Sequence, residues 1–309
     1  MNECTKIVEN ASRVVVGKRR SLELMTVALL AEGHVLLEDV PGLGKTLMAK
    51  ALAKSMGGIF RRIQFTPDLL PADVTGFSVY NQKTGDFVFH PGPVLANVLL
   101  AVEINRTIPR TQASLLESMG EFQVTVDGNT LVLPKPFFVI ATQNPIEMDG
   151  TFPLPEAQLD RFLMKIDIGY PEKDEEIAIL ERFQEEDPLS ELLAVTSPER
   201  IVALQKERSA IDVSPPVREY LADLVTATRV HPKVKYGASP RGSLGLMKAG
   251  QALAAMSGRG YVLPDDVKIL AHPVLAHRII LHHEERAKGF SAKSVLDEIL
   301  SEVPVPQPV

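Results

Sequence analysis

Residues 38–46 are Glu38-Asp39-Val40-Pro41-Gly42-Leu43-Gly44-Lys45-Thr46: glycines that let the backbone approach an anion, then a lysine, then a hydroxyl. A short apolar run of strand length, His34 to Leu37, precedes the stretch. Thr46 to Met56 follows it, with apolar residues at helical spacing. Strand, glycine loop and helix therefore come in the order that phosphate binding requires, and the stretch indicates a P-loop for a nucleoside triphosphate.

Each part of this loop has an expected role. The loop N–H groups and the positive end of the helix dipole should face the phosphates, Lys45 should reach the terminal ones, and the Thr46 hydroxyl should ligate Mg2+. The alternative is a glycine-rich turn with an incidental Gly-Lys-Thr, but both flanking elements favour the P-loop. We expect nucleotide contacts at Pro41, Gly42, Leu43, Gly44, Lys45, Thr46 and Leu47.

Asp39 departs from the general pattern G-x-x-x-x-G-K-[ST], whose first glycine falls at this position. A residue with a side chain here implies a particular loop geometry. Its carboxylate would also repel phosphate unless it points away from the nucleotide.

Length and composition restrict the class of protein. A chain of 309 residues suggests two domains, and a net charge of -6 argues against a general electrostatic grip on nucleic acid. The single cysteine, Cys4, cannot form an internal disulfide, and its place near the start predicts an exposed thiol in a reducing compartment. No apolar run reaches the roughly 18 residues that span a bilayer. We expect a cytoplasmic protein without a membrane span.

Between Val14 and Pro171, short apolar strands alternate with helical patterns. This alternation predicts an α/β fold with a parallel sheet covered on both faces. The expected strands are His34 to Leu37, Ile59 to Phe65, Val98 to Glu103, Phe137 to Thr142 and Lys165 to Ile168.

Two further segments break the alternation and predict inserted β-hairpins. The first has aromatic-rich arms, Phe77 to Tyr80 and Phe87 to Phe89, around a turn-forming stretch. The second places Val124 and its neighbours on a strand closed by Asp127-Gly128, a strong hairpin signal. Hairpins inserted into an α/β core usually have a function outside the core. The alternative is that they only extend its edge and have no function of their own.

After Pro171 the pattern becomes helical, without a convincing strand between Pro198 and Gly289. We therefore expect a first domain over residues 1–187 and a small all-α domain over 188–309. The closing residues 303–309 alternate valine and proline and predict an extended tail. The expected helices are Glu172 to Glu186, Glu199 to Lys206, Pro216 to Val230, Ser243 to Met256 and Pro264 to Leu281.

Hydrolysis of a triphosphate requires acidic side chains near the metal ion and the attacking water. The apolar strand that ends in Glu103 would deliver such an acid to the carboxyl edge of the sheet, where α/β proteins meet their ligands. Glu103 is therefore the expected base that polarises water. The alternative is an exposed charge at a strand end.

The chain resembles the MoxR group of AAA+ ATPases over nearly its whole length. The resemblance implies a P-loop AAA+ core with a five-stranded parallel sheet and two inserted hairpins, followed by an all-α lid, with ATP or ADP and Mg2+ as ligands. The strings that carry it, in the order of that family, are Glu38 to Thr46, Thr66-Pro67-Asp68-Leu69-Leu70-Pro71, Glu103-Ile104-Asn105-Arg106, Ala141-Thr142-Gln143-Asn144-Pro145, Leu154-Pro155-Glu156-Ala157-Gln158-Leu159-Asp160-Arg161-Phe162 and Gly237-Ala238-Ser239-Pro240-Arg241.

The resemblance implies roles at matching positions. Asn144 would be sensor 1, Arg161 the arginine finger given to a neighbouring subunit, and Arg241 sensor 2 on the lid, reaching the γ-phosphate in cis or in trans. Val16 and Gly17 resemble the segment that packs on adenine. From the residues alone, a turn residue and a surface salt bridge are the simpler interpretations of Asn144 and Arg161.

One position departs from the family. Where the MoxR group has Leu-Ala-Asp-Glu-Ile-Asn-Arg, this chain has Val102 in place of the acid before Glu103. That acid would help to hold the Mg2+ shell, so we expect lower Mg2+ affinity and weakened turnover while nucleotide binding persists.

Three functions follow as hypotheses. The leading one is an ATP-hydrolysing, chaperone-like remodeller that forms a homo-oligomeric ring, expected to be hexameric, with a von Willebrand factor A domain protein and a client complex as partners implied by the family. The second is a nucleotide-gated scaffold that hydrolyses slowly because of Val102. The third is a nucleic-acid motor, against which the acidic net charge and the hairpins poor in Lys and Arg both count. The client and the size of the ring stay open.

Overall fold

The structure is a computed structural model that describes residues 3–40, 42–144, 150–184 and 188–306. Five strands form one parallel sheet in the spatial order β2–β5–β8–β1–β9, so β1 lies between β8 and β9. This confirms the expected sheet, with strand ends within a residue or two of the expected ones. The strands are β1 (Val35–Glu38), β2 (Phe60–Gln64), β5 (Val98–Val102), β8 (Phe138–Gln143) and β9 (Met164–Ile166).

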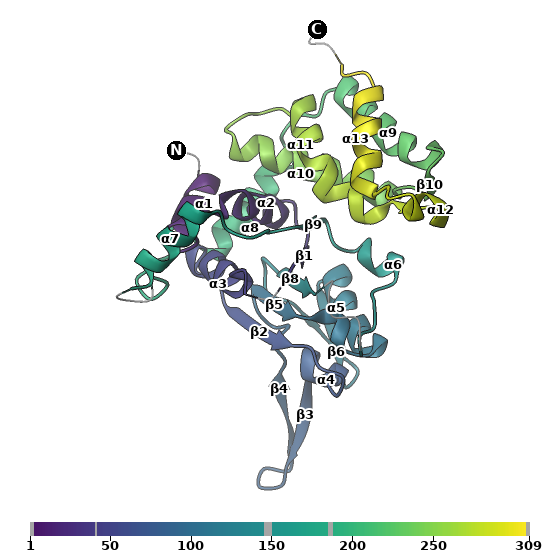
Figure 1. The fold of residues 1–309 in the computed structure, drawn as a ribbon. Coiled ribbons are helices and arrows are strands. Elements are labelled where there is room, and N and C mark those ends of the chain that lie inside the picture. The colour runs from purple at the N-terminus through teal and green to yellow at the C-terminus, as the bar shows by residue number, and fades with distance from the viewer. Residues whose placement is uncertain (1–2, 41, 145–149, 185–187, 307–309) are drawn as a thin grey trace.

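The sheet divides the hydrophobic core of the first domain in two. Successive side chains of β1 enter different clusters: Val35 and Leu37 belong to one, and Leu36 belongs to the other. Both faces are covered by helices (Figure 1), and this explains why the strands are almost continuously apolar. The first face carries α1 (Glu3–Ser12), α2 (Arg19–Leu30) and α3 (Lys45–Ser55), and the second carries α5 (Pro109–Glu121).

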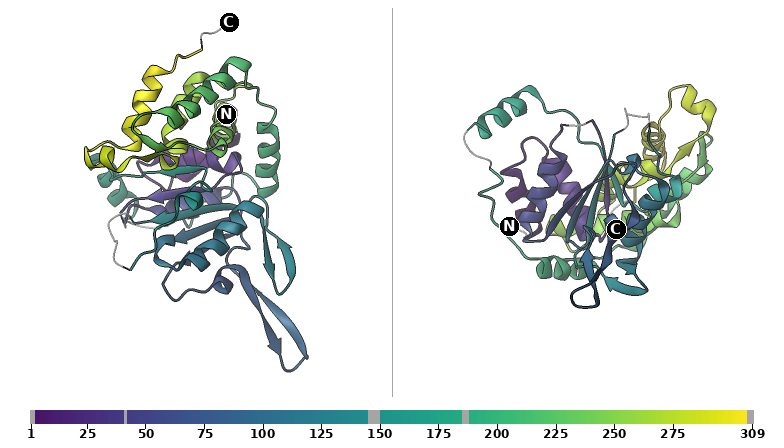
Figure 2. Two further views of the ribbon diagram at one scale, coloured as in Figure 1. Left: turned by 90° about the vertical axis from the view of Figure 1, so that its right-hand side faces the viewer. Right: turned by 90° about the horizontal axis from the view of Figure 1, so that it is seen from below.

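Both expected hairpins are present. The first pairs β3 (Gly76–Asn81) with β4 (Asp86–Pro91), next to the short helix α4 (Pro71–Thr75). The second pairs β6 (Gln123–Val126) with β7 (Asn129–Val132) across Asp127 and Gly128, whose φ values of 51° and 79° are those of a type I′ turn. Figure 2 shows both hairpins on the part of the core remote from the C-terminal helices.

The C-terminal region is mainly helical, with two differences from the expectation. It contains a short antiparallel ladder of β10 (Val234–Tyr236) and β11 (Ile280–Leu281), so the domain is not all-α. The ladder strands are too short to show a period-two pattern in the sequence. The helices are α8 (Pro198–Arg208), α9 (Pro215–Val230), α10 (Pro240–Met256), α11 (Pro264–Leu275), α12 (His283–Ala287) and α13 (Ala292–Glu302).

Two expected helices end early. The helix predicted to run to Leu281 stops at Leu275, soon after Pro273, and the chain continues through the 3-10 turn η2 (Ala276–Arg278). Proline lacks the N–H that continues the helical ladder, and this favours termination there. The charged helix predicted to reach residue 186 is α7 (Lys173–Arg182).

The expectation of an exposed thiol at Cys4 is wrong. Cys4 lies in α1 and is only 2% exposed, because the apolar face of α1 packs into the main hydrophobic cluster. Burial raises the pKa of the Cys4 thiol to about 11. The residue is thus a small core side chain rather than a reactive one.

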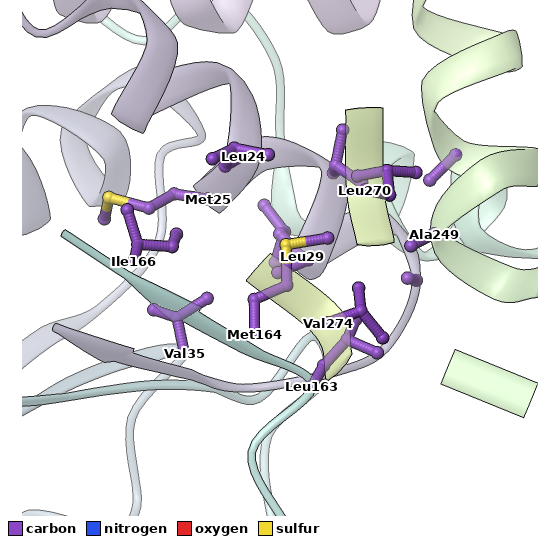
Figure 3. Packing of buried hydrophobic residues seen from close by; sticks show 14 of the residues in the cluster. Leu24, Met25, Leu29, Val35, Leu163, Met164, Ile166, Ala249, Leu270 and Val274 are labelled. Atoms are coloured by element: carbon purple, nitrogen blue, oxygen red, sulfur yellow. The ribbon is translucent and has the colours of Figure 1, made fainter. Parts of the chain in front are cut away.

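The C-terminal helices are packed onto the core through a continuous apolar contact. Figure 3 shows Ala249 of α10 and Leu270 and Val274 of α11 beside Leu29 of α2 and Leu163, which precedes β9. All five belong to the same buried cluster as the first face of the sheet. The lid is therefore held against α2 and β9 by hydrophobic burial as well as by the chain connection.

Candidate functional site

The P-loop has the backbone geometry expected for anion binding. Gly42 and Gly44 have φ of 90° and 80°, a conformation that residues with a side chain rarely adopt. A Cβ at either glycine would meet nothing within 4 Å, so the requirement for glycine is conformational rather than steric. Gly44 caps α3, which begins at Lys45. The first N–H groups of the helix consequently have no intrahelical partner and can bind an anion.

A cavity of about 380 Å³ lies between this loop and the carboxyl ends of β5 and β8. Its wall brings together Lys45, Thr46 and Leu47 from the start of α3 with Glu103 and Asn144 from the two strand ends. Five of the predicted site residues thus line one space. Gly42 and Gly44 also line it, while the predicted contact Pro41 lies outside the described residues.

The Lys45 ammonium is held at the mouth of the loop. Its Nζ donates to the carbonyl oxygens of Asp39 at 2.6 Å and of Val40 at 2.8 Å. Burial lowers the pKa of Lys45, and the nearby charges of Asp39 and Glu103 oppose that shift. An incoming phosphate would replace two neutral carbonyl acceptors with charged oxygens, which are stronger partners of an ammonium group.

The Asp39 carboxylate is bound by backbone N–H groups, although Asp39 also lines the P-loop cavity. Its Oδ2 accepts from the backbone N–H groups of Ile168 at 3.0 Å and Gly169 at 2.6 Å, and its Oδ1 accepts from Val40 N–H at 2.9 Å. Three N–H donors thus stabilise the carboxylate and lessen its repulsion of a phosphate, while its charge still acts on Lys45. Asp39 ties the P-loop to the segment that follows β9.

Glu103 follows β5 in a left-handed backbone conformation, with φ of 57°. Its N–H donates to Thr142 Oγ1 at 2.9 Å, and this fixes the residue against the end of β8. Its carboxylate Oε2 accepts from Gln64 Nε2 at 2.9 Å and lies 3.3 Å from Arg106 Nε. The acid at the end of the strand is thus positioned by three neighbouring segments, and non-glycine residues in this conformation cluster at functional sites.

Val102 is half-buried and lines the same cavity as Thr46 and Glu103. The position one residue before Glu103 therefore lines the same space as Thr46, the residue predicted to ligate Mg2+. In this chain that position offers an apolar side chain.

Arg161 and Arg241 lie elsewhere. Neither lines the P-loop cavity; Arg161 is exposed, and Arg241 Nη1 lies 3.8 Å from Asp160 Oδ2. The adjacent Asp160 is also paired with Arg278, whose Nε donates to Asp160 Oδ1 at 2.7 Å. Arg241 is thus paired with Asp160 at the junction of core and lid, whereas the Arg161 guanidinium lies near α5, where a Cβ built on Gly120 would be 4.0 Å from its Nη1.

Arg278 fastens this junction. Its guanidinium is buried, and it donates to the carbonyl oxygens of Phe162 at 2.6 Å and Leu163 at 3.1 Å as well as to Asp160. Burial lowers the pKa of Arg278, and Asp160 counteracts that shift. Ser239 Oγ also donates to Asp160 Oδ2 at 3.0 Å, which brings the start of α10 to the same carboxylate.

Val16 and Gly17, predicted to pack on adenine, lie beside the start of α7. A Cβ on Gly17 would come within 2.3 Å of the carboxyl carbon of Glu175, so the two segments are in direct contact. Val16 is half-buried and Gly17 is exposed. Next to them, Lys18 Nζ donates to the Tyr170 carbonyl oxygen at 3.0 Å.

Sequence reasoning missed several residues of the site. Thr142 lies next to the last residue of β8, inside one of the quoted family strings, so its position near the carboxyl edge of the sheet was a usable signal. Gln64 carries no local signal, because its contact with Glu103 depends on the pairing of β2 with β5. Asp160 and Arg278 are separated by 118 residues, and only the fold brings them together.

Comparison with known proteins agrees with this geometry. The model of the ATPase family associated with various cellular activities (AAA) matches residues 34–164, and the model of the AAA lid domain matches residues 226–299. The described residues contain no helix both long and apolar enough to cross a membrane.

Relatives match over nearly the full chain. Chaperone MoxR1 of Mycobacterium tuberculosis is 42% identical over 98% of this chain and 82% of its own length. The uncharacterized protein YeaC of Bacillus subtilis is 54% identical over 97% of this chain and 94% of its own, and protein MoxR of Paracoccus denitrificans is 34% identical over 95% and 93%. The crystal structure of a candidate ATPase from Cytophaga hutchinsonii superposes with a TM-score of 0.93 at 39% identity, covering 99% of this chain and 95% of that one. These relatives match the chain over nearly its whole length, and the fold contains the P-loop, the five-stranded sheet and the lid. The chain therefore belongs to the MoxR family of AAA+ ATPases.

Proposed function

We propose that this chain is an ATP-hydrolysing, chaperone-like remodeller that works as a homo-oligomeric ring, of six subunits, and that rearranges a client protein complex. The observation that carries the proposal is the division of the predicted site between two places. Lys45, Glu103 and Asn144 line one cavity. Neither Arg161 nor Arg241 lines it; Arg241 is paired with Asp160, and the Arg161 guanidinium lies near α5. A site whose arginines lie elsewhere is completed most simply by the arginines of a neighbouring subunit.

Each residue then has a chemical role. Lys45 binds the β- and γ-phosphates, and Glu103 accepts a proton as water attacks the γ-phosphorus and the bond to the β-phosphate oxygen breaks. The Asn144 amide orients that water or the γ-phosphate. Arg161, and Arg241 in trans with it, neutralise charge on the transferring phosphoryl group of the adjacent subunit.

The residues present fit Mg2+ with few protein ligands. Thr46 lines the cavity at the start of α3, and Val102 presents no donor opposite it. Mg2+ bound there would neutralise phosphate charge, held by the Thr46 hydroxyl, the phosphates and water. This arrangement supports a second proposal, a scaffold in which nucleotide binding alone switches assembly and hydrolysis is slow.

Partners and compartment are proposed on the family relationship. We expect a von Willebrand factor A domain protein to present the client, with the first hairpin as a contact surface that exposes Phe87. We also propose the cytoplasm as its compartment, as the sequence leads us to expect. For the domains, we propose a core domain over residues 1–187 and a lid domain over residues 188–309.

A metal-dependent ATPase assay on the purified chain tests the proposal. The remodeller should release phosphate from ATP at a rate that rises with Mg2+ and with protein concentration, since the complete site needs two subunits. Lys45→Ala is the control, because it removes the lysine placed to meet the terminal phosphates. Tight ATP binding without measurable phosphate release would favour the scaffold, and unchanged ATP affinity in Lys45→Ala would contradict the P-loop assignment.

A further inference from the structure

The order of the strands sets the direction in which a nucleotide lies across the P-loop. Glu103 and Asn144 follow β5 and β8, on one side of β1. These residues mark the end of the site where the γ-phosphate reacts. The ribose and base must therefore extend toward the other neighbour of β1, which is β9.

The segment that follows β9 is held firmly against the P-loop. The Asp39 carboxylate accepts the N–H groups of Ile168 and Gly169, as described above. The buried side chain of Lys18 donates to the carbonyl oxygen of Tyr170, the next residue. The P-loop thus holds the residues just before Tyr170, and Lys18, which follows Val16 and Gly17, holds the carbonyl group of Tyr170 itself.

The side chain of Tyr170 is free to meet a ligand. The residue is 74% exposed, although its backbone is tied into the core. Gly169 before it has φ of 70°, and Pro171 after it has a restricted φ, so the chain around the ring has little freedom. An aromatic ring on a rigid backbone binds a flat ligand at low cost in conformational entropy.

We propose that the Tyr170 ring is the surface on which the adenine base of ATP stacks, with Val16 and Gly17 beside it. This inference rests on the proposed function, since it assigns a residue to the same nucleotide site. Stacking on a tyrosine ring contributes affinity for the base without distinguishing adenine from guanine, because every base has a π-face. Tyr170 therefore raises the affinity for nucleotides relative to inorganic polyphosphates, but it does not select one nucleotide over another.

The test compares binding of ATP with binding of inorganic tripolyphosphate, which has the phosphates and no base. Calorimetric titrations should use the full chain at a concentration where sedimentation shows single subunits for every variant. Tyr170→Ala should weaken ATP binding about tenfold, within the range of base–aromatic stacking, while tripolyphosphate affinity is unchanged. Tyr170→Phe should retain the parental ATP affinity, because it keeps the ring. Tyr261→Ala, which removes another exposed tyrosine from the lid, is the matched control and should change neither.

Three other results would each overturn the inference, and the measurements distinguish them. Equal losses for ATP and tripolyphosphate in Tyr170→Ala, with an unchanged melting temperature, would mean that Tyr170 supports the P-loop and not the base. Parental ATP affinity in Tyr170→Ala would remove the residue from the site and leave the proposed function intact. Failure of the parent chain to bind either ligand would refute the proposed function, and the stacking role with it.

Discussion

Val102 is the residue at which the sequence departs from the family pattern expected here, and it lines the P-loop cavity together with Thr46. Val102→Asp should lower the Mg2+ concentration needed for half-maximal hydrolysis and raise turnover. A charge-assisted hydrogen bond is worth about 1.5 to 3 kcal/mol, or roughly one to two decades in a rate or equilibrium constant. Phosphate release across a Mg2+ titration measures both effects.

The control for this substitution is Val102→Asn, which has a similar shape without the charge. Because valine is the better strand former and this position packs against the core, the melting temperature of each variant should be measured too. A well-folded Val102→Asp protein with the parental Mg2+ dependence and rate would show that the metal is held in another way, and the weakened-hydrolysis hypothesis would be wrong.

Glu103 is the second single residue to test, because it is the proposed base for hydrolysis of ATP. Glu103→Gln should leave ATP affinity unchanged and abolish hydrolysis, because the amide keeps the shape and the contact with Gln64 but cannot accept a proton. ATP binding by calorimetry and single-turnover hydrolysis separate the two effects. Parental turnover in Glu103→Gln would exclude Glu103 as the base.

At the scale of elements, the contact between β2 and β5 restrains Glu103. The Gln64 amide donates to the carboxylate, and this bond competes with any bond from the carboxylate to water. Gln64→Leu should therefore raise basal hydrolysis, by roughly fivefold if the partly exposed bond is worth about 1 kcal/mol. The matched variant Gln64→Met keeps the length of the side chain without the amide donor and should act in the same direction. A loss of turnover in both variants would mean that Gln64 places Glu103 for catalysis.

An ion pair between distant elements, Asp160 with Arg278, contributes to the joint between core and lid. Arg278 is buried, so Asp160→Ala would leave its charge without a carboxylate partner. Breaking a buried ion pair lowers the free energy of unfolding by about 3 kcal/mol or more. We expect the lower value here, because the Arg278 guanidinium keeps its bonds to the carbonyl oxygens of Leu163 and Phe162. Urea unfolding should show this loss, whereas Asp160→Asn, which keeps the oxygen acceptor, should lose less. Equal stability in Asp160→Ala and the parent chain would contradict the role of the pair.

At the scale of the whole molecule, the proposal that arginines act between subunits can be tested. Arg161→Ala should keep the nucleotide affinity of the isolated subunit and lose hydrolysis, because the guanidinium is proposed to serve a neighbour. Mixing Arg161→Ala with Lys45→Ala subunits should restore partial activity, since some interfaces then join an intact P-loop to an intact arginine. The expected rescue is measured as phosphate release against mixing ratio. No rescue in rings shown by mass to be mixed would argue against action in trans.

Local sequence determined those features whose physical cause is also local. The φ values of Gly42 and Gly44, the turn at Asp127-Gly128 and the five apolar strands all follow from the preferences of a few adjacent residues. Lys45 and Thr46 follow the glycines directly along the chain, so their place in the site could be predicted as well. The role of Val102 was visible only against the family pattern.

The tertiary structure alone decided which of these features meet. The bonds from Asp39 to Ile168 and Gly169 depend on β9 lying beside β1. The burial of Cys4 and the grouping of Arg241 with Asp160 depend likewise on how helices pack against the sheet and lid. Such contacts join residues far apart in the chain, and their energy arises from burial and complementary charge that no short window of sequence contains. The sequence by itself therefore determined the P-loop and the strands, while the partners of each site residue followed from the packing of the whole chain.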